Sequence, residues 1–189
     1  DRDVQSVALG GSVTSATTPN VRAAFQSSAT NLGGVRDQAY VHDVATGATT
    51  LLNRAAGAAG APGDAQSFTP PAISADGTTA LFASGSSNLG DGHEGRFLHV
   101  DVRDLSGAGQ ALDEVSRPTG DDPVAPSGSD DSTFDDSRSV VSATGRYVVF
   151  DSQSDALSSV DDNRVTNVFV RDLQTGTTYW GTGNPAPFP

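Results

Sequence analysis

The sequence predicts an all-β protein built from about three similar repeats, and three observations support this prediction. Short runs of β-branched and aromatic residues, such as residues 147–150, are each closed by turn residues. Within residues 140–180 the run Asn167–Asp172 alternates with a period of two, and no segment keeps the 3.6-residue period of a helix. The features of this stretch recur earlier in the chain, which is typical of a repeat architecture.

The last copy of the repeat shows the order of its elements most clearly. Residues 143–145 are a turn signal, because their Gly tolerates positive φ, and a strand is expected at 147–150. After a long loop come the strand Asn167–Asp172, a hairpin turn at 174–176 and a returning strand at Thr177–Trp180. The unit therefore reads as strand, turn, strand, long loop, strand, turn, strand.

The middle copy matches the last copy at an offset of 68 residues in three separate features. These are the segment 73–77, Phe82 and the tripeptide 103–105, which correspond to 141–145, Phe150 and 171–173. A third copy is expected earlier in the chain, around Phe25, residues 40–44 and Thr46-Gly47. Phe25, Phe82 and Phe150 are thus predicted to occupy equivalent buried positions in successive units.

The motifs in these copies resemble those of a known family. The pattern S-x-D-G-x-x-x-x-F, a loop with N-L, and then V-F-V-R-D-L-x-T-G-x-T resemble the TolB-like (PD40, WD40-like) β-propeller repeat. The form is similar to that of secreted proteins from high-GC bacteria, and the resemblance covers roughly residues 13–180. It implies four-stranded antiparallel blades around a central channel, but no single function. The predicted fold is therefore all-β, with about three four-stranded blades of a partial or associating propeller.

The whole chain, 1–189, is expected to form one repeat region. Its predicted parts are repeats at 13–56, 72–118 and 139–180, followed by a tail at 181–189. Residues 53–71 and 119–137 are expected to be loops, because they are rich in Gly and Pro or in Asp. Residues 1–11 would form either a partial blade or an unrelated N-terminal strand.

Composition excludes several classes of function. The chain has no Cys, so it forms no disulfide and performs no thiol chemistry. A net charge of −12 argues against binding nucleic acid through its phosphates. No apolar run approaches the length of a membrane span.

The strongest metal signal lies in residues 161–167. Members of the resembled family often read D-x-N-G-x-x-D here, a set of oxygen ligands that suits Ca²⁺. This chain has Arg164 in place of the Gly and Asn167 in place of the last Asp, which weakens the motif. Asp161 and Asn163 are the predicted ligands if Ca²⁺ is bound, and the alternative is a polar turn. No other cofactor is predicted.

Two further groups are weaker candidates for metal binding. Three Asp pairs, at 121–122, 130–131 and 135–136, would either chelate calcium or form a solvated face. His93 and His99 are six residues apart, too far for the four-residue spacing of a zinc-protease motif. No G-x-S-x-G nucleophile motif occurs.

The function predicted from these observations is a secreted, non-catalytic binding or structural module that acts through protein–protein or glycan contacts. The alternative is a propeller enzyme, a polysaccharide lyase or hydrolase, with its site at the channel mouth. That alternative needs His or Asp side chains from several blades to converge, and convergence of His42, His93 and His99 on one pocket would favour it. Because three blades leave two open faces, the expected partner is another copy of the chain or a further propeller segment.

Overall fold

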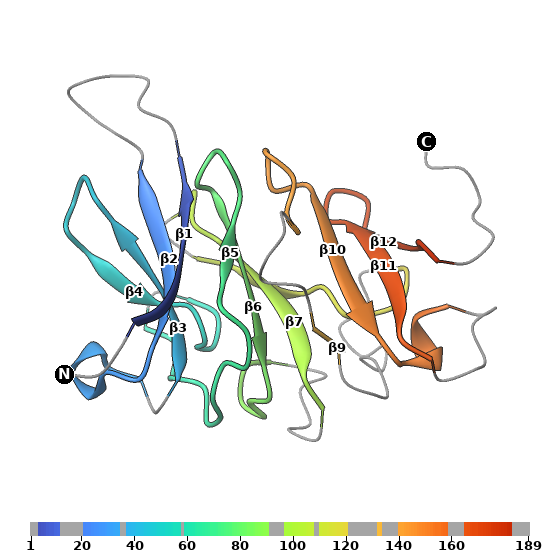
Figure 1. Cartoon of the computed structure of the whole chain (residues 1–189), viewed down its shortest axis with the longest axis horizontal. Coiled ribbons are helices and arrows are strands. Elements are labelled where there is room, and N and C mark those ends of the chain that lie inside the picture. The colour runs from blue at the N-terminus through green and yellow to red at the C-terminus, as the bar shows by residue number, and fades with distance from the viewer. Residues whose placement is uncertain are drawn as a thin grey trace.

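The computed structural model describes residues 4–11, 21–34, 37–57, 59–90, 97–107, 110–120, 132–133, 140–158 and 165–182. Its strands form three four-stranded antiparallel sheets that lie in a row along the long axis of the molecule (Figure 1). In each sheet the strands follow chain order, so each sheet is a simple meander. We call the three sheets blade 1, blade 2 and blade 3.

The strands have the following bounds. Blade 1 contains β1 (Val4–Gly10), β2 (Arg22–Ser27), β3 (Gln38–Asp43) and β4 (Thr49–Leu51). Blade 2 contains β5 (Ala72–Ile73), β6 (Thr79–Ser84), β7 (His99–Asp104) and β8 (Leu112–Glu114). Blade 3 contains β9 (Ser132–Thr133), β10 (Tyr147–Ser152), β11 (Asn167–Asp172) and β12 (Thr177–Trp180). This architecture confirms the predicted all-β class of four-stranded blades.

Helical structure is confined to single turns in the described part of the chain. These are the 3-10 turns η1 (Thr30–Leu32) and η2 (Asp155–Leu157). No described helix is long and apolar enough to cross a membrane.

The N-terminal strand corrects one expectation from the sequence. Residues 1–11 were expected to form a partial blade or an unrelated strand, but β1 pairs with β2 from Val7 opposite Phe25 to Gly10 opposite Arg22. β1 is therefore the first strand of blade 1, and it completes a four-stranded sheet.

The three blades share one strand register, which makes their positions directly comparable. The second strands begin at Arg22, Thr79 and Tyr147, and these residues pair with the last residues of the third strands, Asp43, Asp104 and Asp172. Phe25, Phe82 and Phe150 therefore occupy one equivalent position, as predicted. Phe82 and Phe150 are buried, whereas Phe25 is only half-buried.

The Asp that ends each third strand shapes the turn that follows. A carboxylate oxygen of Asp43 accepts hydrogen bonds from the N–H groups of Ala45 and Thr46. Asp104 and Asp172 accept equivalent bonds from the N–H groups two residues further on. In blades 1 and 3 the turn ends at a Gly with positive φ, as expected for a hairpin.

The first strand differs most between the blades. In blade 1 it is continuous over β1. In blade 2 the pairing is split between β5 and an isolated bridge from Ser67 to Ser84. In blade 3 it is split between β9 and an isolated bridge from Val141 to Val148.

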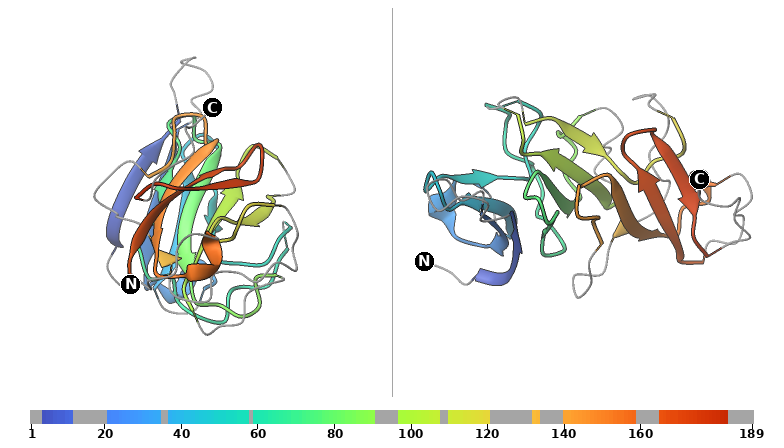
Figure 2. Two further views of the ribbon diagram at one scale, coloured as in Figure 1. Left: turned by 90° about the vertical axis from the view of Figure 1, so that its right-hand side faces the viewer. Right: turned by 90° about the horizontal axis from the view of Figure 1, so that it is seen from above.

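The hydrophobic core lies between neighbouring blades rather than within one blade. We call the face of each blade that carries Phe25, Phe82 or Phe150 its front face, and the opposite face its rear face. One apolar cluster joins the rear face of blade 1, through Ala24 and Val41, to Phe82 on the front face of blade 2. A second cluster joins the rear face of blade 2 to the front face of blade 3. The blades are therefore stacked face to face, as the two rotated views also show (Figure 2).

Candidate functional site

The front face of blade 1 exposes an apolar surface. Val4, Val7 and Leu9 on β1 expose 55%, 60% and 73% of their area. The pairing register places Val7 beside Phe25 and Leu9 beside Ala23 on this same face. The loop at Gly34 lies over Tyr40 at one end of the face, so the open surface is the part nearest β1.

The same positions are buried wherever another blade lies in front of them. Leu9 pairs with the second residue of β2, just as Ile73 and Val141 pair with the second residues of β6 and β10. Ile73 is 8% exposed and Val141 is 6% exposed, whereas Leu9 is 73% exposed. Leu9 thus has the position and the apolar chemistry of a junction residue, but no described blade lies in front of it.

A buried Arg stabilises the junction between blades 1 and 2. Arg103 on β7 is 0% exposed and reaches back to the segment that follows β4. Its Nε donates to the carbonyl of Leu52 at 2.9 Å, and one terminal nitrogen donates to the carbonyl of Arg54. The other terminal nitrogen donates to the carbonyl of Gln110 at 2.8 Å. Burial, followed by the charge of Arg54, lowers the pKa of Arg103 to about 10, so the guanidinium stays charged at neutral pH.

Blade 3 repeats this arrangement 68 residues later. Arg171 on β11 is 1% exposed and donates to the carbonyl of Pro118 at 3.1 Å and to that of Gly120 at 3.0 Å. Both acceptors lie in the segment that follows β8 of blade 2. In each junction, the Arg of the later blade therefore binds the backbone of the earlier blade.

His42 occupies the equivalent position in blade 1. It lies on the front face, and its Nδ1 is 3.0 Å from the hydroxyl of Thr49 on the neighbouring strand of the same blade. Arg occupies this position in blades 2 and 3, each of which follows another described blade. His42 occupies it in blade 1, which follows no described blade.

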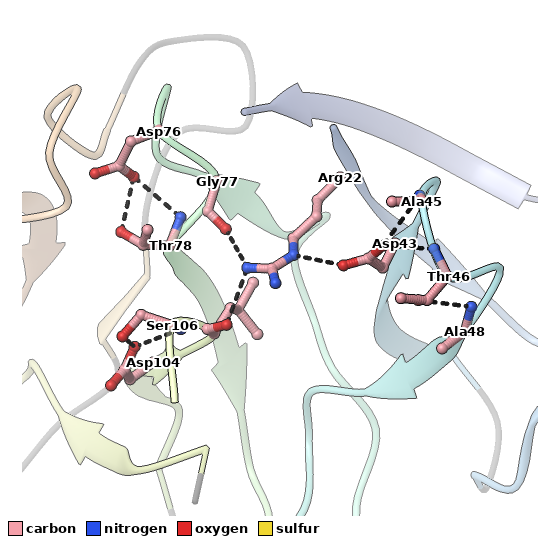
Figure 3. A network of polar contacts seen from close by, with 11 residues as sticks. Arg22, Asp43, Ala45, Thr46, Ala48, Asp76, Gly77, Thr78, Asp104 and Ser106 are labelled. Atoms are coloured by element: carbon pink, nitrogen blue, oxygen red, sulfur yellow. Dashed lines mark hydrogen bonds and ion pairs between the residues drawn. The ribbon is translucent and has the colours of Figure 1, made fainter. Parts of the chain in front are cut away.

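A second cross-blade contact starts from the rear side of blade 1. Arg22 donates from Nε to Asp43 at 3.1 Å, and its terminal nitrogen donates to two carbonyls of blade 2. These are the carbonyls of Gly77, at 2.8 Å, and Leu105, at 3.0 Å (Figure 3). An Arg–Asp pair at the end of the third strand thus connects a rear face to the next blade.

Blade 3 has a similar Arg–Asp pair at its own rear edge. Arg146 contacts both carboxylate oxygens of Asp172, at 3.0 and 2.7 Å, and Asp172 is the register equivalent of Asp43. The Asp172 side chain is 1% exposed, whereas the Arg146 side chain is 38% exposed. The hydrogen bond from Arg146, together with the N–H of Gln174, lowers the pKa of Asp172 from 3.8 to about 2.

This pair makes stability depend on pH in the acid range. Because the folded-state pKa lies below the unfolded value, the pair stabilises the fold fully above pH 3.8 and loses its effect as pH falls toward 2. Asp172→Asn is expected to lower the melting temperature at neutral pH and to flatten its fall between pH 3.8 and 2. Thermal melts of both proteins across this range test the prediction. Parallel melting curves at every pH would contradict it.

A groove also lies between blades 2 and 3. It has a volume of about 430 Å³ and is lined by residues of the segment after β8, of η2 and of β12. Among them are Pro118, Asp155, Thr178 and Trp180.

The residues predicted to bind metal lie outside the described part of the chain. This applies to Asp161 and Asn163, and to the Asp pairs at 121–122, 130–131 and 135–136. The described residues contain no group of three or more His, Asp or Glu side chains placed to hold a metal ion. Calcium binding at Asp161 and Asn163 stays a prediction.

The described histidines do not converge. His42 is the fifth residue of β3, and His99 is the first residue of β7, so they sit near opposite ends of equivalent strands. Four residues of strand span about 13 Å. His99 is buried, with its Nδ1 2.8 Å from a Glu114 carboxylate oxygen. His93, the third member of the proposed pocket, lies outside the described residues.

The stacked four-stranded meanders place this chain in the β-propeller class of folds, as an open row of three blades. No protein-family model matches the sequence. No curated protein matches it either. Among solved structures, the crystal structure of TolB from Acinetobacter baumannii matches with 17% identity and a TM-score of 0.45. The match covers 94% of this chain and 31% of the TolB chain, so this chain spans about a third of that protein's length.

Proposed function

We propose that this chain is a non-catalytic, extracellular binding module that binds a protein partner through the front face of blade 1. The observation that supports the proposal is the 73% exposure of Leu9 at a register position that is buried in both other blades. Exposed apolar patches of this kind mark interaction sites on soluble proteins. The extracellular location rests on the resemblance of the repeats to those of secreted proteins, and secretion of the full-length protein into culture medium tests it.

A protein is a better ligand for this face than a glycan. The open surface presents aliphatic side chains, from Val4, Val7 and Leu9, beside Ala23 and the half-buried ring of Phe25. A glycan needs hydrogen-bonding groups directed at its hydroxyls, whereas an aliphatic surface gains free energy by covering apolar area.

The proposal is tested with a library of peptides displayed on phage and selected on the intact chain. The affinity of a selected, fluorescently labelled peptide is then measured for the intact chain and for Leu9→Asp. Losing the burial of one Leu side chain costs about 1.5–3 kcal/mol, which is roughly a tenfold or greater loss of affinity.

Val44→Asp is the matched control. Val44 is an apolar residue with 51% exposure, but it lies in the turn after β3 rather than on the sheet face. Its substitution should leave affinity and melting temperature unchanged, because the site is exposed and lies away from the sheet face. Equal affinity of the intact chain and Leu9→Asp would overturn the proposal.

A further inference from the structure

The rear face of blade 3 is the second face that no described blade covers, and it also has the composition of a junction. Val149, Val170 and Val168 stand on this face at the register positions of Leu81, Val102 and Val100 in blade 2. The three residues of blade 2 are at most 5% exposed, because blade 3 covers them. In blade 3, Val168 is 38% exposed, and Val149 and Val170 are half-buried. Aliphatic residues are thus present on a face that no described blade covers.

The edge of this face also has the polar chemistry of a junction. In blade 1 the pair of Arg22 and Asp43 extends to the carbonyls of Gly77 and Leu105 in the next blade. Arg146, one residue before the register equivalent of Arg22, forms a similar pair with Asp172, and its side chain is 38% exposed. The rear face of blade 3 therefore offers both the apolar surface and the partly exposed Arg that a following blade would contact.

The two open faces complement each other. Every internal junction joins the rear face of one blade to the front face of the next. The open front face belongs to blade 1 and the open rear face to blade 3, at opposite ends of the row (Figure 1). One chain therefore presents both halves of the same type of junction, in positions where they cannot meet within that chain.

We propose that two copies of this chain join head to tail, with the front face of blade 1 of each copy on the rear face of blade 3 of the other. This inference rests on the proposed function, because it assigns a partner to the same front face. Closed propellers usually hold four to eight blades. Two copies supply six blades, which is within this range, whereas three copies would supply nine. A two-copy ring also satisfies every open face, as closed symmetric assemblies do.

The first measurement is the mass of the intact 189-residue chain in solution, by light scattering over a range of concentrations. The expected mass is twice the 19.2 kDa of one chain. Leu9→Asp, on the front face, and Val168→Asp, on the rear face, should each weaken the assembly. In a two-copy ring each substitution occurs at both junctions, so the dissociation constant should rise by about a hundredfold. Val44→Asp is the control and should leave the mass unchanged.

Mixing the two variants tests the head-to-tail arrangement directly. Each variant alone has an Asp in both junctions, whereas the mixed pair keeps one unaltered junction, between the front face of Val168→Asp and the rear face of Leu9→Asp. If one buried Asp abolishes the junction that it enters, the mixture should form a two-copy complex at concentrations where each variant alone is a single chain. A front-to-front assembly predicts that Val168→Asp stays paired, and that mixing gives no rescue.

Three results would overturn the inference. They are a single-chain mass at all concentrations, an assembly that Val168→Asp leaves intact, and an assembly of more than two copies. If the intact chain remains single but Leu9→Asp still loses affinity for a selected peptide, self-association fails while the proposed function stands. If the peptide affinity is also unaffected by Leu9→Asp, both fail.

Discussion

Replacing Phe82 or Phe150 with Ala is expected to lower the free energy of unfolding by about 3–5 kcal/mol. Each ring lies on a front face against the rear face of the preceding blade, with 0% and 1% exposure. Phe150 also stacks on Phe169, with ring centroids 5.6 Å apart. Truncation removes these contacts and leaves a cavity that two packed sheets cannot close.

The equivalent change at Phe25 should cost much less, roughly 1–2 kcal/mol, because the ring is only half-buried and keeps mainly its contact with Tyr40. Urea unfolding of the three variants measures the difference. The comparison is best made in the Leu9→Asp background, in which the chain is expected to be single, with Phe25 uncovered. Similar losses at all three positions in that background would show that Phe25 is buried by something other than a second copy.

Removing the cross-blade Arg should have an effect of similar size. Arg103→Met is expected to lower the free energy of unfolding by about 3–5 kcal/mol, the usual cost of deleting one member of a buried charged network. It would leave the Gln110 carbonyl without its Arg103 donor, the Leu52 carbonyl with the N–H of Arg54 alone, and Asp101 without the positive charge of Arg103. Arg103→Lys should recover little, because an ammonium cannot reproduce the divergent donors of a guanidinium.

His42→Ala is the matched control, at the same register position in blade 1. Its contact with Thr49 lies within one blade and is exposed, so the change should stay within about 0.5 kcal/mol. Urea unfolding measures all three variants in the Leu9→Asp background, in which the front face of blade 1 is expected to be uncovered. Equal losses for Arg103→Met and His42→Ala would show that the cross-blade hydrogen bonds do not stabilise the junction.

The sequence predicted the features that repeat at a fixed spacing. Phe82 and Phe150, the Arg-Asp dipeptides of blades 2 and 3 and the turn at Gly176 lie where the offset of 68 residues and the turn chemistry placed them. The Arg of each dipeptide was recognised only as a marker of the repeat. Its alternation with apolar neighbours on a buried strand was the available signal for its role, because a buried Arg needs several acceptors.

The first strands and the open faces were not predictable in the same way. β5 and β9 are two residues long, and a two-residue strand shows no periodicity. The pattern of Val7 and Leu9 is that of a core strand, and only the structure shows that no described blade covers them. The predicted calcium ligands, Asp161 and Asn163, lie outside the described residues.

The direction of the Arg contacts has a consequence for folding during synthesis on the ribosome. For Arg103 and Arg171, the acceptor carbonyls across the junction belong to the blade that is made first, and the Arg belongs to the blade that is made next. Each emerging blade therefore meets a template whose backbone acceptors for Arg103 or Arg171 are already in place. Because contacts within each meander are local, we expect the blades to assemble vectorially, from the N-terminal blade onward.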